Sequence, residues 1–242
     1  MQASSSSILL TATFEVPGLP LPVAVRRLAT ARRLRLRIDH DRQLLRLTLP
    51  ARSSARAALR WAGEQRAWVE QQLASAPGAS PFVDGATVPF RGEQLTIRWQ
   101  EGARRAVRRV GPELQVGGPR PSLARSIERW LLAAAREELS AETARIAALA
   151  GVSVRSVAVG DAATRWGSCS SAGAIRYSWR LILAPPEVLR FVVAHEVAHR
   201  LHMDHSPGFK AAEERLFGGP VSDARRLLRE LGPALRRVGR GS

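Results

Sequence analysis

Four of the five histidines in the chain lie within eleven residues, at positions 195, 199, 202 and 205. The segment His195-Glu196-Val197-Ala198-His199 has the H-E-x-x-H spacing. On a helix, residues four apart share a face, so His195 and His199 can bind one metal ion. Zinc binds neutral imidazole and, at catalytic sites, keeps one position for water. Glu196 projects about 100° around the helix from His195, which predicts that it accepts a proton from that water as the general base.

Several residues are candidates for the third ligand of such a site. His205 lies six residues after His199, as in the metzincin signature, but His202 stands where that signature has glycine, so the pattern is not that of a metzincin. His202 would share a helix face with the first two ligands, although three ligands from one straight helix fit a tetrahedral site poorly. A chain turn just after His202 would bring His205 back, and we therefore favour His205. Glu213 and Glu214, on the next expected helix, are further candidates by analogy with zinc sites built from two histidines and a glutamate.

The elements around this motif predict a helix-rich C-terminal half. Proline is tolerated in a first helical turn, so Pro185-Pro186 predicts the start of the helix that contains the motif, and the apolar segment Val188–Ala194 predicts its burial. Apolar residues at helical spacing predict a long helix from Ser122, a candidate cap, to Gly151. Further strands are expected at 152–159 and 174–179, and further helices near 207–217 and 221–231.

Short extended segments predict a β-rich N-terminal half. Residues 34–38 and 44–49 largely alternate apolar with polar side chains, which predicts a β-hairpin whose arginines line its solvated face. One amphipathic helix is expected from a cap at Ser53 or Ser54 to Leu73. A second β region is expected at 87–90, 95–99 and 114–116, and the glycines and prolines of 117–121 form the best candidate linker. We therefore expect an α+β protein with two domains, 1–118 and 119–242.

The C-terminal half resembles a known family in the histidine motif and in several other segments. They are Thr164–Ser170, Ile175-Arg176, Trp179–Leu181, Ala184–Pro186, Val193–His202, His205-Ser206 and Phe209. In these residues the chain is similar to the YgjP-like metal-dependent hydrolases, which are related to the zincin peptidases and to the SprT-like and WLM proteins. The Arg-rich N-terminal hairpin is covered only loosely. The resemblance implies a zincin-like C-terminal half, one zinc ion held by His195, His199 and His205, and Glu196 as the catalytic acid/base.

The resemblance also suggests roles for residues that precede the motif helix. In zincins an edge strand above the active-site helix can pair with an extended substrate, so Ala174–Ser178 is a candidate for that pairing. Arg165 or Tyr177 could stabilise a developing oxyanion, although the simpler expectation is that Arg165, Trp166 and Trp179 brace the fold. Cys169 is expected to be a small core residue rather than a nucleophile or a ligand.

Composition limits the class of protein and its partners. The formal net charge of +16 would favour polyanions. However, Lys210 is the sole lysine and the arginines are dispersed, as a GC-rich coding bias would produce, so charge alone decides nothing. A single cysteine excludes an intramolecular disulfide and suits a reducing cytoplasm. Neither a signal peptide nor a membrane-spanning segment is expected, so the protein should be soluble, without a membrane partner.

The first expectation for function is a cytoplasmic zinc metallopeptidase that acts on a peptide or protein substrate. The second is a metal-dependent phosphohydrolase acting on nucleotides, because the same chemistry polarises phosphoryl oxygens and the arginines would suit an anionic substrate. The third is a nucleic-acid-associated protein whose basic N-terminal region recruits the catalytic half to DNA or RNA.

Overall fold

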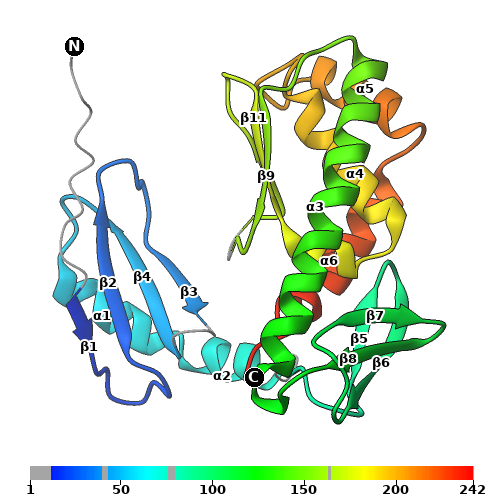
Figure 1. Cartoon of the computed structure of the whole chain (residues 1–242). Coiled ribbons are helices and arrows are strands. Elements are labelled where there is room, and N and C mark those ends of the chain that lie inside the picture. The colour runs from blue at the N-terminus through cyan, green and yellow to red at the C-terminus, as the bar shows by residue number, and fades with distance from the viewer. Residues whose placement is uncertain (1–11, 40–42, 76–79, 163–164, 242) are drawn as a thin grey trace, which may run out of the picture. The chain divides into compact units, whose positions relative to one another are not determined.

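The chain forms two compact units, Met1–Ala76 and Pro77–Ser242 (Figure 1). The computed structural model describes residues 12–39, 43–75, 80–162 and 165–241. Both units contain strands and helices, which confirms the expected mixture of α and β structure. None of the helices in the described part of the chain is both long enough and apolar enough to cross a bilayer.

Within residues 12–39 and 43–75, the first unit forms a four-stranded sheet followed by two helices. Its elements are β1 (Ala12–Phe14), β2 (Val23–Leu28), β3 (Arg35–Asp39), β4 (Leu44–Pro50), α1 (Ala55–Glu64) and α2 (Arg66–Ser75), with strand order β1-β2-β4-β3. β3 and β4 pair antiparallel, as expected for a hairpin, although residues 40–42 between them lie outside the described part. Leu45, Leu47 and Leu49 are fully buried against α1 and α2, whereas Arg46 points to solvent. The alternating pattern thus identified both the hairpin and its buried face.

The expectation of one helix from Ser53 or Ser54 to Leu73 was wrong, because the segment forms two. Ser54 caps α1, and its hydroxyl accepts a hydrogen bond from the backbone of Ala57. The helix ends at Gln65, whose N–H turns back to the carbonyl of Ala62, and α2 starts at the next residue. Gly63, which is weaker than alanine in a helix by about 1 kcal/mol, precedes this break. Apolar periodicity continues across the junction, so the pattern alone did not show it.

In the described residues of the second unit, two sheets and four α-helices surround one hydrophobic core. Its first sheet consists of β5 (Thr87–Phe90), β6 (Glu93–Gln100), β7 (Val107–Val110) and β8 (Glu113–Gly117), in the order β5-β6-β8-β7. The rest comprises η1 (Arg120–Ser122), α3 (Leu123–Ala150), β9 (Ser156–Gly160), β10 (Gly167–Cys169), β11 (Ala174–Ser178), η2 (Trp179–Leu183), α4 (Pro186–Ala198), α5 (Pro207–Phe217) and α6 (Ser222–Leu235). The second sheet has the order β10-β11-β9. Figure 1 shows α3 running from the first sheet to the second.

The long helix α3 matches its expected range closely. Gly151 ends it in the left-handed conformation, with φ 67°, and donates to the carbonyls of Ala147 and Ala148. The expected cap at Ser122 was wrong in its chemistry, because the Ser122 hydroxyl donates to the Pro119 carbonyl and makes no cap bond to the helix. Buried leucines and isoleucines of α3 belong to the same core as those of β6, β8 and α4.

The glycine pair expected to form a linker instead lies in close backbone packing. The Gly117 N–H donates to the Ala106 carbonyl (2.8 Å), and that of Gly118 donates to the Ala103 carbonyl (3.0 Å). A Cβ at Gly117 would lie 2.1 Å from the carbonyl oxygen of Arg104. The contacts therefore group β5 to β8 with the elements that follow them, within Pro77–Ser242. A separable hydrolase domain that begins at residue 119 stays a prediction.

This packing predicts a large effect of a small substitution. We expect Gly117→Ala to lower the free energy of unfolding by about 1–3 kcal/mol, because the new methyl group overlaps a backbone carbonyl that cannot rotate away. Gly160→Ala is the matched control, since a Cβ at that strand glycine meets no atom within 4 Å. Urea denaturation of both variants measures the difference. Equal stability of the two alanine variants would contradict the close approach at Gly117.

Candidate metal centre

The helix α4 presents two histidines one turn apart from an otherwise buried segment. Pro185 and Pro186 stand at its start, where a missing N–H costs nothing. Almost every residue from Val188 to Ala194 is buried, as the apolar sequence predicted. His195 lies in the last turn, and His199 is the residue at which the helix ends. Burial of these residues fixes the position of α4, and this position determines where His195 and His199 lie.

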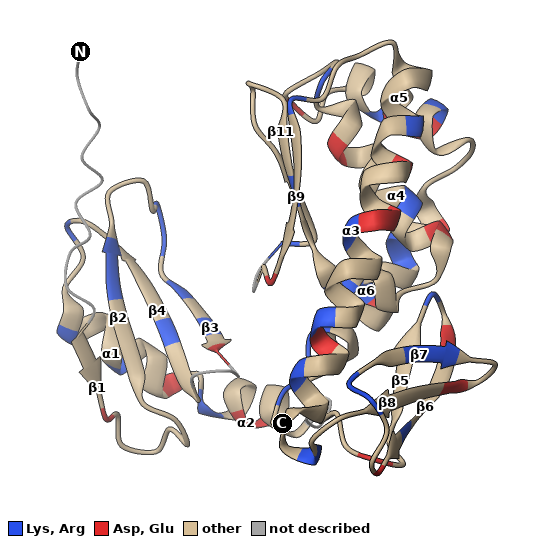
Figure 2. Cartoon of the chain, viewed as in Figure 1, with Lys and Arg blue, Asp and Glu red and all other residues tan. Residues whose placement is uncertain are grey.

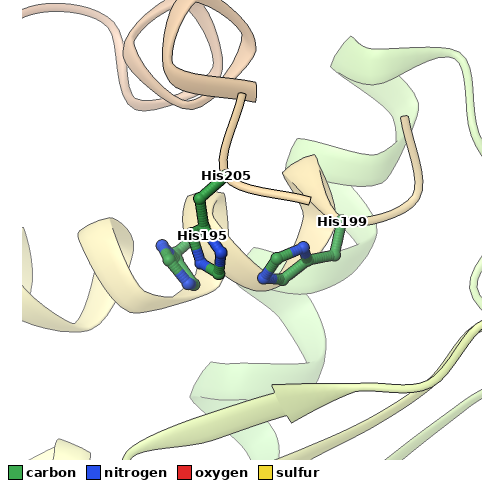
Figure 3. A group of neighbouring side chains, drawn as sticks. All are labelled: His195, His199 and His205. Atoms are coloured by element: carbon green, nitrogen blue, oxygen red, sulfur yellow. The ribbon is translucent and has the colours of Figure 1, made fainter. Parts of the chain in front are cut away.

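A third histidine returns to α4 from the segment that leads into α5. Ring centroids are separated by 5.0 Å for His195 and His199, 5.3 Å for His195 and His205, and 4.9 Å for His199 and His205. One ring nitrogen from each lies within 4.8 Å of the other two. Figure 3 shows the three rings close together. The Ser206 hydroxyl caps α5 by accepting from the Phe209 N–H, which fixes the chain next to His205.

His202 and Glu213, two other candidates for the third ligand, make hydrogen bonds to the histidines instead. The His202 carbonyl accepts a hydrogen bond from Nδ1 of His199 (3.1 Å), and its ring is not part of the cluster. Glu213 is 1% exposed; its Oε1 accepts from Nδ1 of His195 (2.8 Å), and its Oε2 accepts from Arg225 (2.7 Å). Glu213 therefore lies behind His195, where it fixes the direction of the ring. Glu214, its neighbour in α5, is exposed.

These bonds determine which ring nitrogens are available to a metal. A carboxylate and a carbonyl can only accept, so the protons of His195 and His199 are assigned to Nδ1. Nε2 of each ring is then left with a free lone pair, as in many metal sites whose histidines donate to an outer carboxylate or carbonyl. Burial and the neighbouring histidines lower the pKa of His199, which favours the neutral ring. The donor set therefore fits a divalent transition metal.

Electrostatics also support the ionised state of Glu213. Burial alone would raise its pKa, but the hydrogen bond from His195 and the charge of Arg225 outweigh burial and hold the pKa below its usual value. Arg225 reaches Glu213 from α6 and also lies over the Phe191 ring, 5.5 Å from its centroid. From the sequence, Glu213 was a candidate ligand, and its orienting role was not predicted. The sequence pattern that could have indicated this role is a glutamate on the buried face of α5, between Phe209 and Leu216.

Glu196 is buried between α4 and the strand β10. Only 5% of the residue is exposed, and a Cβ at Gly167 would lie 2.4 Å from its Oε1, so any larger residue at that position of β10 would displace the Glu196 side chain. Burial raises the pKa of Glu196 to about 7, although the charges of His195 and Arg165 oppose the rise. A carboxyl group with a pKa near neutrality can both accept and return a proton at physiological pH.

The remaining residues singled out from the sequence lie around this site in different ways. Tyr177 is 2% exposed and its hydroxyl lies 3.1 Å from that of Thr143, which donates to the Leu139 carbonyl. The Tyr177 hydroxyl therefore bonds Thr143 in the core, and burial and the charge of Glu196 raise its pKa. Arg165 is exposed and acts on Glu196 through its charge. Cys169 is half-buried against the core, and burial raises its pKa, so it is no activated thiolate.

The expectation that Ala174–Ser178 is an edge strand was wrong. β11 is the central strand of its sheet, paired antiparallel to β10 and parallel to β9. Both of its edges are therefore already hydrogen bonded. The short strand β10, which contacts α4, is the edge strand next to Glu196.

Comparison of the sequence with known protein families identifies the family of this chain. Residues 32–230 match the description "YgjP-like, metallopeptidase domain". The chain belongs to the YgjP-like metallopeptidase family. The match begins in the first unit and ends in α6, so the YgjP-like region includes residues of both units. Searches of curated proteins and of solved structures found no match. Membership confirms the resemblance and makes the chain a metal-dependent hydrolase of metallopeptidase type.

Proposed function

We propose that the protein is a zinc metallopeptidase in which His195, His199 and His205 hold one Zn²⁺ per chain and Glu196 is the general base. The observation that carries this proposal is the histidine cluster, in which two rings have Nδ1 bonded to an acceptor and a buried glutamate lies beside them. Three neutral imidazoles are a known ligand set of catalytic zinc, with a fourth position left for water.

The residues of the chain divide the chemistry between them. Bound zinc would supply a Lewis acid and lower the pKa of a water to about 7. Glu196 accepts a proton from the nucleophile and returns it to the leaving amine, a role that its raised pKa suits. Glu213 keeps His195 in one tautomer and one direction. Each of these roles belongs to a side chain held by buried contacts.

The edge strand β10 supports a peptide as the substrate. The Ser178 N–H donates to the carbonyl of Trp166 (2.9 Å), just before β10. Hydrogen-bonded residues alternate along an antiparallel pair, so the N–H and C=O groups of Gly167 and Cys169 point away from β11. An extended peptide added at this free edge would run beside Glu196. Nucleotide hydrolysis, in contrast, is supported only by the ability of a bound metal to polarise phosphoryl oxygens and by the arginine surplus, and nucleic-acid binding only by the arginine surplus.

Metal content is the direct test of the ligand set. Elemental mass spectrometry of the purified protein should find about one zinc per chain, and His205→Ala should lose most of it because two histidines bind zinc weakly. His202→Ala is the matched control and should keep the metal, since only its backbone carbonyl contacts the cluster. A wild-type protein that stays metal-free after zinc is supplied would contradict the proposal. Screens against peptide and nucleotide libraries then decide the substrate class.

The edge-strand arrangement predicts an alternating effect of N-methylation on a cleaved peptide. An N-methyl group at a residue whose N–H faces β10 should lower kcat/KM by about tenfold, because one backbone hydrogen bond is lost. N-methylation at the next residue should have little effect, since that N–H points the other way. The measurement is a series of singly methylated peptides. A uniform loss along the series would contradict strand addition.

A further inference from the structure

A cavity of about 440 Å³ lies between the beginning of α3 and the strand β7, apart from the histidine cluster. It is lined by Arg105, Ala106, Val107, Ser126, Arg129 and Trp130. None of these residues belongs to α4 or α5, and none is acidic. The volume is within the range of small-molecule sites. Figure 2 shows basic residues both on β7 and on the first turns of α3.

One of the residues that line this cavity, Ser126, has a buried hydroxyl without a hydrogen-bond partner. Ser126 is 5% exposed, and its Oγ is buried without a hydrogen bond. A buried hydroxyl that lacks a partner costs about 1–3 kcal/mol, so such groups are normally satisfied by the protein, by water or by a ligand. Ser126 stands near the start of α3, where the helix dipole favours an anion.

Two arginines extend over the same cavity without acidic partners. Neither Arg105 nor Arg129 has a salt bridge or a side-chain hydrogen bond among the described residues. The backbone of Arg105 is fixed, because its neighbours Ala103 and Ala106 accept hydrogen bonds from Gly118 and Gly117. Arg98 and Arg109 of the same sheet, in contrast, form salt bridges with Glu113 and Glu93. Uncompensated positive charge and an unpaired hydroxyl thus meet in one place.

We propose that this cavity binds the phosphate group of a small phosphate monoester whose apolar body lies against Trp130 and Val107. A phosphate carries about two negative charges and three terminal oxygens, enough to meet two guanidinium groups and the Ser126 hydroxyl together. A carboxylate has one charge and two oxygens, so it would satisfy fewer of these donors. The Trp130 ring, held 4.9 Å from the Phe90 ring, provides a fixed apolar wall. The proposal does not depend on the peptidase activity.

Calorimetric titration of the full-length, zinc-loaded protein with phenyl phosphate tests this site. We expect one molecule to bind per chain in this cavity. Inorganic phosphate should bind more weakly because it lacks the apolar body, and phenol and benzoate should bind more weakly still. Arg105→Gln and Arg129→Gln should each weaken phenyl phosphate binding by about tenfold, the value of one charge-assisted hydrogen bond.

Matched controls separate this site from general charge and from the metal. Arg108→Gln and Arg125→Gln remove the same charge from β7 and from α3, yet neither residue lines the cavity. Both should bind phenyl phosphate as the wild type does. Ser126→Ala should fold normally, because alanine is favoured in a helix, and should bind less tightly. The proposal would be overturned if phenyl phosphate did not bind. It would also be overturned if binding persisted in both Arg105→Gln and Arg129→Gln, because the ligand would then be bound by the metal or elsewhere on the surface.

Discussion

Glu196→Gln is expected to keep its zinc and to lose peptide hydrolysis by about 10²–10⁴-fold, the usual contribution of a general base. Glutamine has the size of glutamate, so it keeps the contact with Gly167 that leaves no room for a larger group. It cannot accept and return a proton, however. The measurements are kcat on a cleaved peptide and zinc content by elemental mass spectrometry.

The expected pattern distinguishes a general base from a ligand. A ligand variant loses zinc and activity together, whereas a base variant loses activity alone. Glu187→Gln, in the first turn of α4, removes the same charge from the same helix away from the histidines and should keep full activity. If Glu196→Gln hydrolysed the peptide at the wild-type rate, another group would have to move the proton.

Local patterns were sufficient to predict the elements that depend on one buried face. The hairpin β3–β4 followed from alternating leucines and arginines, and α3 followed from apolar spacing that ends at Gly151. The H-E-x-x-H spacing on α4 likewise placed His195 and His199 on one face. In each case the signal lies within a few neighbouring residues, so no tertiary contact was needed to recognise it.

Features that depend on contacts between distant segments of the chain were predicted less well. Whether β11 is an edge or a central strand depends on β9, which reaches it through a parallel pairing that the sequence of β11 does not encode. Gly117 and Gly118 have the composition of a linker, and only their contact with residues 103–106 reveals close packing. Glu213 has the same side chain whether it binds a metal or a histidine. Composition and spacing cannot separate these alternatives, because each depends on residues from another element.

Glu213→Gln is expected to weaken zinc binding by about 10–100-fold, the usual effect of losing an outer-shell carboxylate. The carboxylate bonds His195 on one side and Arg225 on the other. An amide can accept from only one of them, and its NH₂ group must then face a donor. His195 is consequently held less firmly and is a weaker base toward the metal. Competition with a chromophoric chelator measures the affinity.

Glu214→Gln provides the matched control for this effect, because it removes the same charge from the adjacent, exposed position of α5 and should leave zinc affinity unchanged. The size of the change also separates two roles for Glu213. Complete loss of zinc from folded protein, equal to that of His205→Ala, would make Glu213 a ligand. An intermediate loss is expected if Glu213 acts through His195, since three imidazoles still hold the metal. Zinc affinity in the Glu213 variant therefore tests whether the carboxylate orients the cluster or belongs to it.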